Sequence, residues 1–348
     1  GPTAAIVPIK QLGTNGGGYF GVNSSHPLEN PNAFTNMLEC WSILIIPMAM
    51  AWAFGFYVRR RKLAAWIFGV MLFAFTAGIF VSVPQEMGGN PNIDEMGIAQ
   101  DLGSMEGKEI RIGSAASAMW GMVTTVTSNG SVNSMHDSQT PLSGMMQMLN
   151  MQINCWFGGV GVGWMNYFAF LIIAVFISGL MVGRTPDYLG KRIEGREITW
   201  CMVALLACAT PILCFSAVAA VSSWGTGALN NAGAHGLSEI LYAFTSGAQN
   251  NGSAFAGLSA NVPVWNVLLA LAMFIGRFGV MLSMLVVAGS LAARKKRPIS
   301  DSSFPVEGPT FGLLLLGIIF IVGALTYLPA LSLGPIVEQF QMMRGMMF

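Results

Sequence analysis

The chain has 348 residues, of which 53% are hydrophobic and 9% are charged, and its formal net charge is +1. Soluble globular domains carry about 25% charged residues, so this composition excludes an ordinary water-exposed surface and predicts a membrane protein. The near-neutral charge argues against a nucleic-acid partner, which requires a basic face. Glycine is unusually frequent, with 42 residues, and glycine is the residue that permits left-handed backbone turns.

Six apolar stretches reach the length of about 20 residues that a helix needs to cross the hydrocarbon core. In chain order they are residues 37–57, 66–83, 145–182, 200–221, 264–292 and 311–333. The third is almost twice as long as one span requires and contains a glycine-rich run at 158–163. Its length favours a break in the helix, although small residues at this spacing also allow close helix packing.

Basic residues gather between alternate spans, at 59–62, 184–196 and 294–297. Because Lys and Arg accumulate in cytoplasmic loops, this alternation predicts that all three clusters are cytoplasmic. The acidic stretch at 84–111 then lies outside the cell. The alternative is that the clusters are only solvated loops, which does not explain why they alternate in phase with the spans.

A short motif recurs three times, each time on the predicted outer side. We name its copies the first, second and third Asn-Gly segments; they read Thr14-Asn15-Gly16-Gly17, Ser128-Asn129-Gly130-Ser131 and Asn250-Asn251-Gly252-Ser253. Repeats that recur at similar long intervals along the chain, as these do, are typical of transporters and channels built by duplication. A single Asn-Gly pair usually marks a surface turn, but three copies between spans favour a different interpretation.

Short apolar stretches at 114–126 and 237–244 precede the second and third segments and are too short to cross the membrane. A short helix followed by an extended return forms a re-entrant pore loop, whose backbone is tolerated at membrane depth where it lines a cavity. Rings of backbone carbonyls can replace the hydration shell of K⁺. We therefore predict a cation filter made by Thr14, Asn15, Gly16, Thr127, Ser128, Asn129, Gly130, Asn250, Asn251 and Gly252.

Longer motifs around these segments resemble a known family. They occupy residues 12–20, 26–31, 105–109, 127–138, 183–191, 250–259 and 276–279. Together they are similar to signatures of the channel-like, potassium-binding A subunit of the Kdp potassium-transporting P-type ATPase, and the resemblance covers essentially the whole chain.

The resemblance implies an all-α, polytopic membrane protein in which membrane helix–pore loop–membrane helix units surround a K⁺ filter with pseudo-fourfold symmetry. Only three filter segments are present here, so we expect the chain to be a C-terminal portion that lacks the first pore repeat. The expected division is 1–63 (pore loop and second helix of repeat 2), 64–197 (repeat 3, pore loop near 114–138), 198–298 (repeat 4, pore loop near 237–260) and 299–348 (last helix and tail).

The resemblance also implies a place for the protein. Its expected location is the bacterial or archaeal inner membrane, with the filter loops outside. The expected partners are a P-type ATPase catalytic subunit, two small subunits and membrane lipid. K⁺ is the transported ion, no covalently bound cofactor is expected, and ATP and Mg²⁺ belong to the partner subunit.

Arg277 lies in the middle of an apolar span, where an arginine costs about 2.5–3.5 kcal/mol to insert. We expect it to face protein or water beneath the filter and to oppose passive leak of cations; snorkelling to the interface is the alternative. The resemblance further implies that Gly158, Gly159, Gly161 and Gly163 form a gating loop under the filter.

The three histidines, His26, His136 and His235, lie near the predicted pore loops. Metal binding needs convergent ligands, and the sequence spacing reveals none, so hydrogen bonding is their expected role and no transition metal is predicted.

Two other functions remain as alternatives. A stand-alone Trk- or Ktr-type potassium transporter would use similar filters without an ATPase. An integral-membrane enzyme would need a catalytic constellation, and the sequence contains no GxxxxGK[ST] phosphate loop and no Asp-Lys-Thr-Gly phosphorylation motif. We therefore expect the chain itself to be non-catalytic.

Overall fold

The computed structural model describes residues 1–21, 23–259, 261–296 and 305–346. Arg297 of the predicted basic loop and Ala260 at the end of the predicted third pore loop lie outside these ranges. Within the described residues, six helices are long and apolar enough to cross a membrane. This result confirms the prediction of a mostly helical, multi-pass membrane protein.

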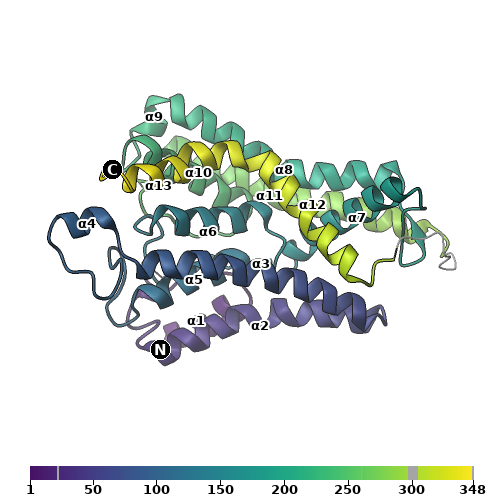
Figure 1. Cartoon of the computed structure of the whole chain (residues 1–348), viewed down its shortest axis with the longest axis horizontal. Coiled ribbons are helices and arrows are strands. Elements are labelled where there is room, and N and C mark those ends of the chain that lie inside the picture. Colours follow the sequence, from purple (N-terminus) through teal and green to yellow (C-terminus); the bar gives the residue numbers. More distant parts are fainter. Residues whose placement is uncertain (22, 260, 297–304, 347–348) are drawn as a thin grey trace.

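The long helices run roughly lengthwise through the molecule (Figure 1). They are α2 (Ala33–Tyr57), α3 (Arg61–Met87), α7 (Val162–Val182), α8 (Gly195–Val221), α11 (Pro263–Ala293) and α12 (Pro309–Leu331). Local signals set several of their ends: a capping box of Asn32 and Thr35 begins α2, and prolines begin α11 and α12. Gly183, in a left-handed conformation, ends α7.

Shorter elements connect the long helices. They are α1 (Pro2–Leu12), η1 (Asn23–Ser25), α4 (Pro91–Glu95), α5 (Ser114–Val126), α6 (Pro141–Ile153), β1 (Asp187–Tyr188), β2 (Lys191–Arg192), α9 (Ser223–Thr226), α10 (Gly233–Ala248), the π-helical turn η2 (Ser332–Ile336) and α13 (Val337–Met342). The two strands pair antiparallel, with Asp187 opposite Arg192. The sequence did not predict this hairpin within the basic loop.

The third apolar stretch is broken, as predicted, but the break lies earlier in the chain than predicted. Helix α6 ends at Ile153 and α7 begins at Val162, so the connecting loop is 154–161 rather than 158–163. Gly163 lies inside α7, where an added Cβ would lie 2.1 Å from the Cα of Gly158. Gly163 therefore allows the loop to pack against the first turn of the helix instead of interrupting the helix.

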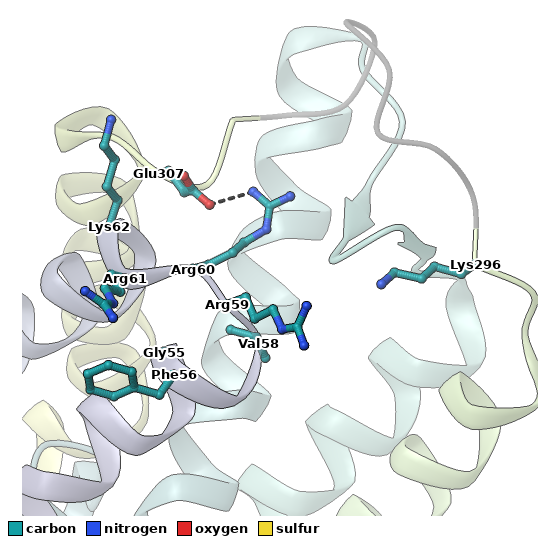
Figure 2. Close-up of a pocket in the computed structure, with 9 residues that line it drawn as sticks. All are labelled: Gly55, Phe56, Val58, Arg59, Arg60, Arg61, Lys62, Lys296 and Glu307. Carbon is teal, nitrogen blue, oxygen red and sulfur yellow. Dashed lines mark hydrogen bonds and ion pairs between the residues drawn. The ribbon is translucent and has the colours of Figure 1, made fainter.

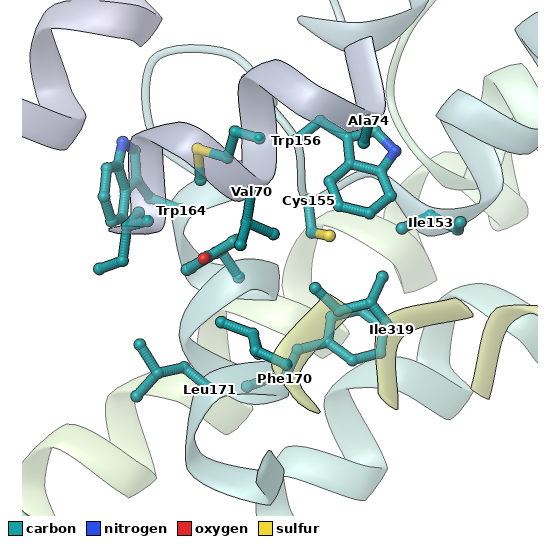
Figure 3. Close-up of a cluster of buried hydrophobic side chains, with 14 of the residues drawn as sticks. Val70, Ala74, Ile153, Cys155, Trp156, Trp164, Phe170, Leu171 and Ile319 are labelled. Atoms are coloured by element: carbon teal, nitrogen blue, oxygen red, sulfur yellow. The ribbon is translucent and has the colours of Figure 1, made fainter. Parts of the chain in front are cut away.

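The largest apolar cluster surrounds this loop (Figure 3). Cys155 and Trp156 are buried between α3, α7 and α12, whose cluster members include Val70, Phe170 and Ile319. Burying a large apolar side chain contributes about 1.5–3 kcal/mol. The loop is thus anchored on one side by apolar packing, which fixes the position of its glycines on the other side.

The ends of α2 and α11 and the β-hairpin, which carry basic residues, lie at the end of the molecule opposite α4 (Figure 1). Arg59, Arg60, Arg61, Lys62 and Lys296 surround a cavity of about 660 Å³ together with Glu307 (Figure 2). Lys191 of the β-hairpin reaches the same end, where its Nζ donates to the carbonyl of Leu291 over 2.6 Å. The three predicted basic loops therefore share one end of the structure over the residues described.

Candidate functional site

The three Asn-Gly segments have the same backbone conformation. The residue before each Asn is left-handed, with φ of 49° at Thr14, 53° at Ser128 and 54° at Asn250. The following glycines also have positive φ: 69° at Gly16, 89° at Gly130 and 88° at Gly252. Such φ values are strained for a residue with a side chain, so the shared conformation explains why this motif recurs.

Each segment follows the C-terminal end of a short helix, α1, α5 or α10. The Asn backbone N–H donates over 3.0 Å to a carbonyl five residues earlier, that of Lys10, Thr124 or Ser246. The negative ends of the helix dipoles therefore lie at the segments, a favourable field for a cation. Helix α5 corresponds to the predicted stretch 114–126, whereas α10 is longer than the predicted 237–244.

Adjacent segments pack edge to edge through their glycines. A Cβ added to Gly16 would lie 1.8 Å from the carbonyl oxygen of Asn129, and one added to Gly130 would lie 2.1 Å from that of Asn251. The first segment therefore meets the second in the same way as the second meets the third. Only glycine permits approaches this close, because a Cβ essentially never comes within 3.0 Å of another heavy atom.

Asparagine side chains join the segments in the same order. Asn129 Nδ2 donates to the Lys10 carbonyl over 3.0 Å, and Asn251 Nδ2 donates to the Thr124 carbonyl over 2.9 Å. Lys10 and Thr124 occupy equivalent positions, five residues before the Asn of their own segments. Asn129 and Asn251 thus tie their segments to the end of the short helix that leads into the previous segment.

The series is open at both edges. Among the described residues, no atom lies within 4 Å of a Cβ added to Gly252. Asn15 Nδ2, which has no preceding described segment to reach, instead donates to the carbonyl of Ile9 in its own helix over 3.4 Å. In the described part of the chain, no Asn carbonyl lies against the glycine of the third segment, and the Asn side chain of the first segment reaches no neighbouring segment. These are the two kinds of contact that join the other segments.

The loop 154–161 contacts the segments. A Cβ added to Gly159 would lie 2.8 Å from the carbonyl oxygen of Thr127, and the Val160 N–H donates to Thr14 Oγ1 over 3.1 Å. Among the predicted gating residues, Gly158 and Gly159 lie in this loop and Gly161 caps α7 with a φ of 137°. The structure thus brings the predicted filter and gating residues together, with Gly163 the exception.

Asn154, which the sequence analysis did not identify, joins two segments. It is fully buried and left-handed, with φ of 41°. Its Oδ1 accepts a hydrogen bond from Ser128 Oγ, and its Nδ2 donates over 3.2 Å to the backbone and side-chain oxygens of Gln249. Asn154 therefore holds the second segment beside the residue that precedes the third.

We expect Asn154→Ala to destabilise the protein by about 2–4 kcal/mol, because it leaves buried polar partners unsatisfied and places alanine in a left-handed conformation. Thermal unfolding of the purified full-length subunit in detergent measures the effect. The matched control is Asn266→Ala, which removes an exposed hydrogen bond of 3.4 Å to Asn261 and should change stability by less than about 0.5 kcal/mol. Equal unfolding midpoints for the two variants would contradict the role of Asn154.

Arg277 reaches the third segment from the middle of α11. Its Nε donates to Asn250 Oδ1 over 3.2 Å, and the rest of the side chain is exposed in the described chain. Gly276 beside it permits the approach of α10, since an added Cβ would lie 1.7 Å from the Ala248 carbonyl oxygen. The predicted intramembrane arginine thus contacts a predicted filter residue directly.

Two buried ion pairs hold residues that precede the first segment and follow the second. Lys10 Nζ pairs with Glu29, whose second oxygen accepts from the Phe20 N–H over 2.8 Å. Lys108 Nζ lies 2.9 Å from Glu86 Oε2, and both side chains are fully buried. Removing one partner of a buried pair costs about 3–5 kcal/mol, so the first pair fixes the last turn of α1, which precedes the first segment. The second pair fixes residues that follow the second segment, because Lys108 Nζ also donates to the Ser138 carbonyl over 3.3 Å. Lys10 is the one charged residue of α1, and this is the sequence feature that could have indicated the first pair.

The three histidines have different surroundings. His26 stacks on Phe20 with ring centroids 3.9 Å apart. His136 is buried against the Tyr242 hydroxyl at 2.7 Å, and burial lowers its pKa to about 3. Burial also acts to lower the pKa of His235, but the hydrogen bonds that its ring makes to the Asp137 and Glu338 carboxylates outweigh that effect and raise its pKa to about 10.

Comparison with known proteins identifies the family. The family described as "Potassium-transporting ATPase A subunit" matches residues 1–340. Proteins named "Potassium-transporting ATPase potassium-binding subunit" are similar along the whole chain: that of Phocaeicola vulgatus is 61% identical over 347 residues, covering 97% of this chain and 61% of the relative. That of Nitratidesulfovibrio vulgaris is 60% identical over 348 residues, covering 100% of this chain and 61% of the relative.

A more distant relative has the same name and the same coverage. The Flavobacterium johnsoniae protein is 49% identical over 354 residues, which cover 98% of this chain and 61% of that protein. The chain thus spans 61% of the length of the curated relatives it matches. Because the family match extends over nearly every residue, the chain belongs to the potassium-transporting ATPase A subunit family.

Proposed function

We propose that this chain forms most of a K⁺ filter in the channel-like subunit of an ATP-driven potassium import pump. The observation that carries the proposal is the edge-to-edge packing of three similar glycine turns, with Gly16 against the Asn129 carbonyl and Gly130 against the Asn251 carbonyl. Carbonyl rings of this kind replace the hydration shell of K⁺. The relatives named as potassium-binding subunits support the same function.

The filter residues in this proposal are those of the three Asn-Gly segments and Thr127. We further propose that a fourth segment completes a pseudo-fourfold ring between Gly252 and Asn15, since those two positions have complementary unfilled contacts. The chain then divides into the units 1–63, 64–197, 198–298 and 299–348. This division places one Asn-Gly segment in each of the first three units.

The orientation follows from charge. A basic cavity is surrounded by Arg59–Lys62 and Lys296. If this cavity faces the cytoplasm, the positive-inside rule is satisfied. The acidic residues near α4 and the outer ends of the Asn-Gly segments then face the exterior of a bacterial or archaeal inner membrane. K⁺ would enter from that side.

Passage beyond the filter is restricted in this proposal by the loop 154–161 and by Arg277. The loop contacts Thr14 and Thr127, so movement of its glycines would change the space beneath the filter. A fixed positive charge beside Asn250 opposes passive leak of cations. Coupling to ATP then requires a P-type ATPase subunit, which binds ATP and Mg²⁺, and the pump also contains two small subunits.

A growth experiment tests this function. The full-length subunit and its pump partners are expressed in cells that lack their own high-affinity K⁺ uptake, and growth at micromolar K⁺ is measured. We expect growth that is lost when the phosphorylated Asp of the ATPase subunit is replaced. Growth that survives this replacement would favour the Trk- or Ktr-type alternative, and no growth in any combination would contradict the proposal.

For Arg277→Met we expect passive K⁺ leak through the assembled pump to increase and K⁺-stimulated ATPase activity to fall by about tenfold, because the charge beneath the filter is removed. Potassium flux from loaded vesicles without ATP measures the leak. Arg277→Lys is the matched control, since it retains the charge but not the Nε donor to Asn250. If Arg277→Met changes neither the passive K⁺ leak nor the ATPase stimulation, Arg277 has no role in coupling.

A further inference from the structure

Three potential metal ligands converge beside the Asn-Gly segments, at the end of the molecule where α13 lies. Asp137 follows the second segment, and His235 and Glu239 lie on α10, which leads into the third. One ligand atom from each lies within 4.8 Å of the others. Asp137 and His235 also line a cavity of about 500 Å³, which gives an ion a path to them.

The imidazole of His235 is oriented as in many metal sites. Its Nδ1 lies 2.6 Å from Glu338 Oε1 on α13, while its Nε2 points to Asp137 Oδ1 at 2.9 Å. Metal-bound histidines commonly donate their second N–H to a carboxylate, which fixes the tautomer and the ring orientation. The ring also stacks on Phe255, with centroids 5.9 Å apart.

Two carboxylate oxygens face the same point as Nε2. A Cβ added to Gly257 would lie 2.5 Å from Asp137 Oδ1 and 2.6 Å from Glu239 Oε1, so glycine is what leaves room for both. Glu239 is held in place by the backbone N–H groups of Asn230 and Asn231, each at 3.0 Å.

Three carboxyl groups surround one imidazole in this cluster. Asp137, Glu239 and Glu338 are largely buried, and His235 is the one basic side chain that pairs with any of them among the described residues. Like charges at close range in a poorly solvated site are costly unless a cation compensates them. A divalent ion at the point that His235 Nε2, Asp137 and Glu239 face would supply that compensation.

We propose that His235 Nε2, Asp137 and Glu239 bind a divalent first-row transition ion, with Zn²⁺ as the best match. One imidazole nitrogen, two carboxylate oxygens and a water give the four-coordinate N/O set that Zn²⁺ accepts. Mg²⁺ and Ca²⁺ prefer oxygen-only sites and are disfavoured by the imidazole. On binding, the ion takes the position of any proton on Nε2, which leaves to solvent. The proton on Nδ1 stays on the ring and donates to Glu338.

The position of the site suggests what the ion does. The Asp137 N–H already donates to the Phe255 carbonyl over 2.8 Å, so the loops after the second and third segments touch here. An ion shared by Asp137 and α10 holds these two loops together from the outer side. This inference does not depend on K⁺ selection by the segments and is tested without a transport measurement.

The test uses the full-length subunit within its pump complex, treated with chelator and then titrated with ZnCl₂ in a calorimeter. The absorption spectrum after addition of CoCl₂ is a second probe of an imidazole ligand. We expect saturable binding that His235→Gln and Asp137→Asn each weaken by at least tenfold. The controls are His26→Gln, a histidine outside the cluster, and Glu106→Gln, an exposed carboxylate on the same cavity. Both controls should bind within twofold of the unchanged protein.

Several results would overturn the proposal. They are the absence of saturable Zn²⁺ binding to the unchanged protein, equal weakening by the control variants, and displacement of Zn²⁺ by an equimolar amount of Mg²⁺ or Ca²⁺. Because the first result needs no variant, the test does not depend on whether His235→Gln folds. Asp137→Asn keeps the size of the side chain and so separates a lost ligand from lost packing.

Discussion

Replacing Gly130 with alanine is expected to weaken K⁺ binding by the full-length subunit by about 100-fold, which corresponds to about 2.8 kcal/mol. Two effects act together. The residue has φ of 89°, where a Cβ costs about 1–2 kcal/mol. The new Cβ would also lie 2.1 Å from the Asn251 carbonyl oxygen, so that carbonyl must move by more than an ångström to reach ordinary contact distance. Titration of K⁺-stimulated ATPase activity in the assembled pump measures the loss.

The matched control for this variant is Gly113→Ala. Gly113 precedes α5 with φ of 82°, and no described atom lies within 4 Å of an added Cβ. This variant also places a Cβ at a positive φ but displaces no described carbonyl, so we expect less than a tenfold change in K⁺ affinity. If Gly130→Ala and Gly113→Ala behave alike, the close approach of the second and third segments does not serve ion binding.

The parts of the fold that follow from local sequence were predictable. Each of the six apolar stretches contains one long helix or most of one, because their length and hydropathy leave few alternatives in a membrane. Helix α5 has the predicted bounds because the polar segment from Thr127 onward ends the apolar stretch. The recurrence of Asn-Gly was visible because the second residue of each pair has a positive φ, which favours glycine.

The contacts between segments were not predictable, because they depend on residues far apart in the chain. Asn154 is one polar residue in an apolar stretch, and its bonds to Ser128 and Gln249 exist only after the loop folds against both segments. The glycine run suggested a break at 158–163, but the buried side chains of Cys155 and Trp156 belong to the loop and move its start to 154.

Two of the three residues in the cluster of Asp137, His235 and Glu239 lie close together in the sequence. His235 and Glu239 are four residues apart on α10, a spacing that places them on one face of a helix. Asp137, however, is 98 residues from His235, and only the packing of the second segment against the third brings it near. A search for close ligand spacing in the sequence therefore misses the site.

The proposed fourth segment leads to the second large prediction, for Gly252→Ala. Gly252 has φ of 88°, nearly that of Gly130, but no described atom lies within 4 Å of an added Cβ. If a fourth segment completes the ring, its carbonyl covers Gly252 as the Asn251 carbonyl covers Gly130. Gly252→Ala should then weaken K⁺ binding by about 100-fold, as Gly130→Ala does.

If the position beside Gly252 is open in the full-length subunit, only backbone strain remains, and the loss should match the less than tenfold change expected of Gly113→Ala. K⁺ titrations of all three variants in the same assembled pump therefore distinguish a closed ring from an open one. Thermal unfolding adds an independent measurement, since a displaced carbonyl lowers stability whether or not the segment binds K⁺. A mild effect of Gly252→Ala on both affinity and unfolding would contradict the pseudo-fourfold ring while leaving the contacts among the first three segments intact.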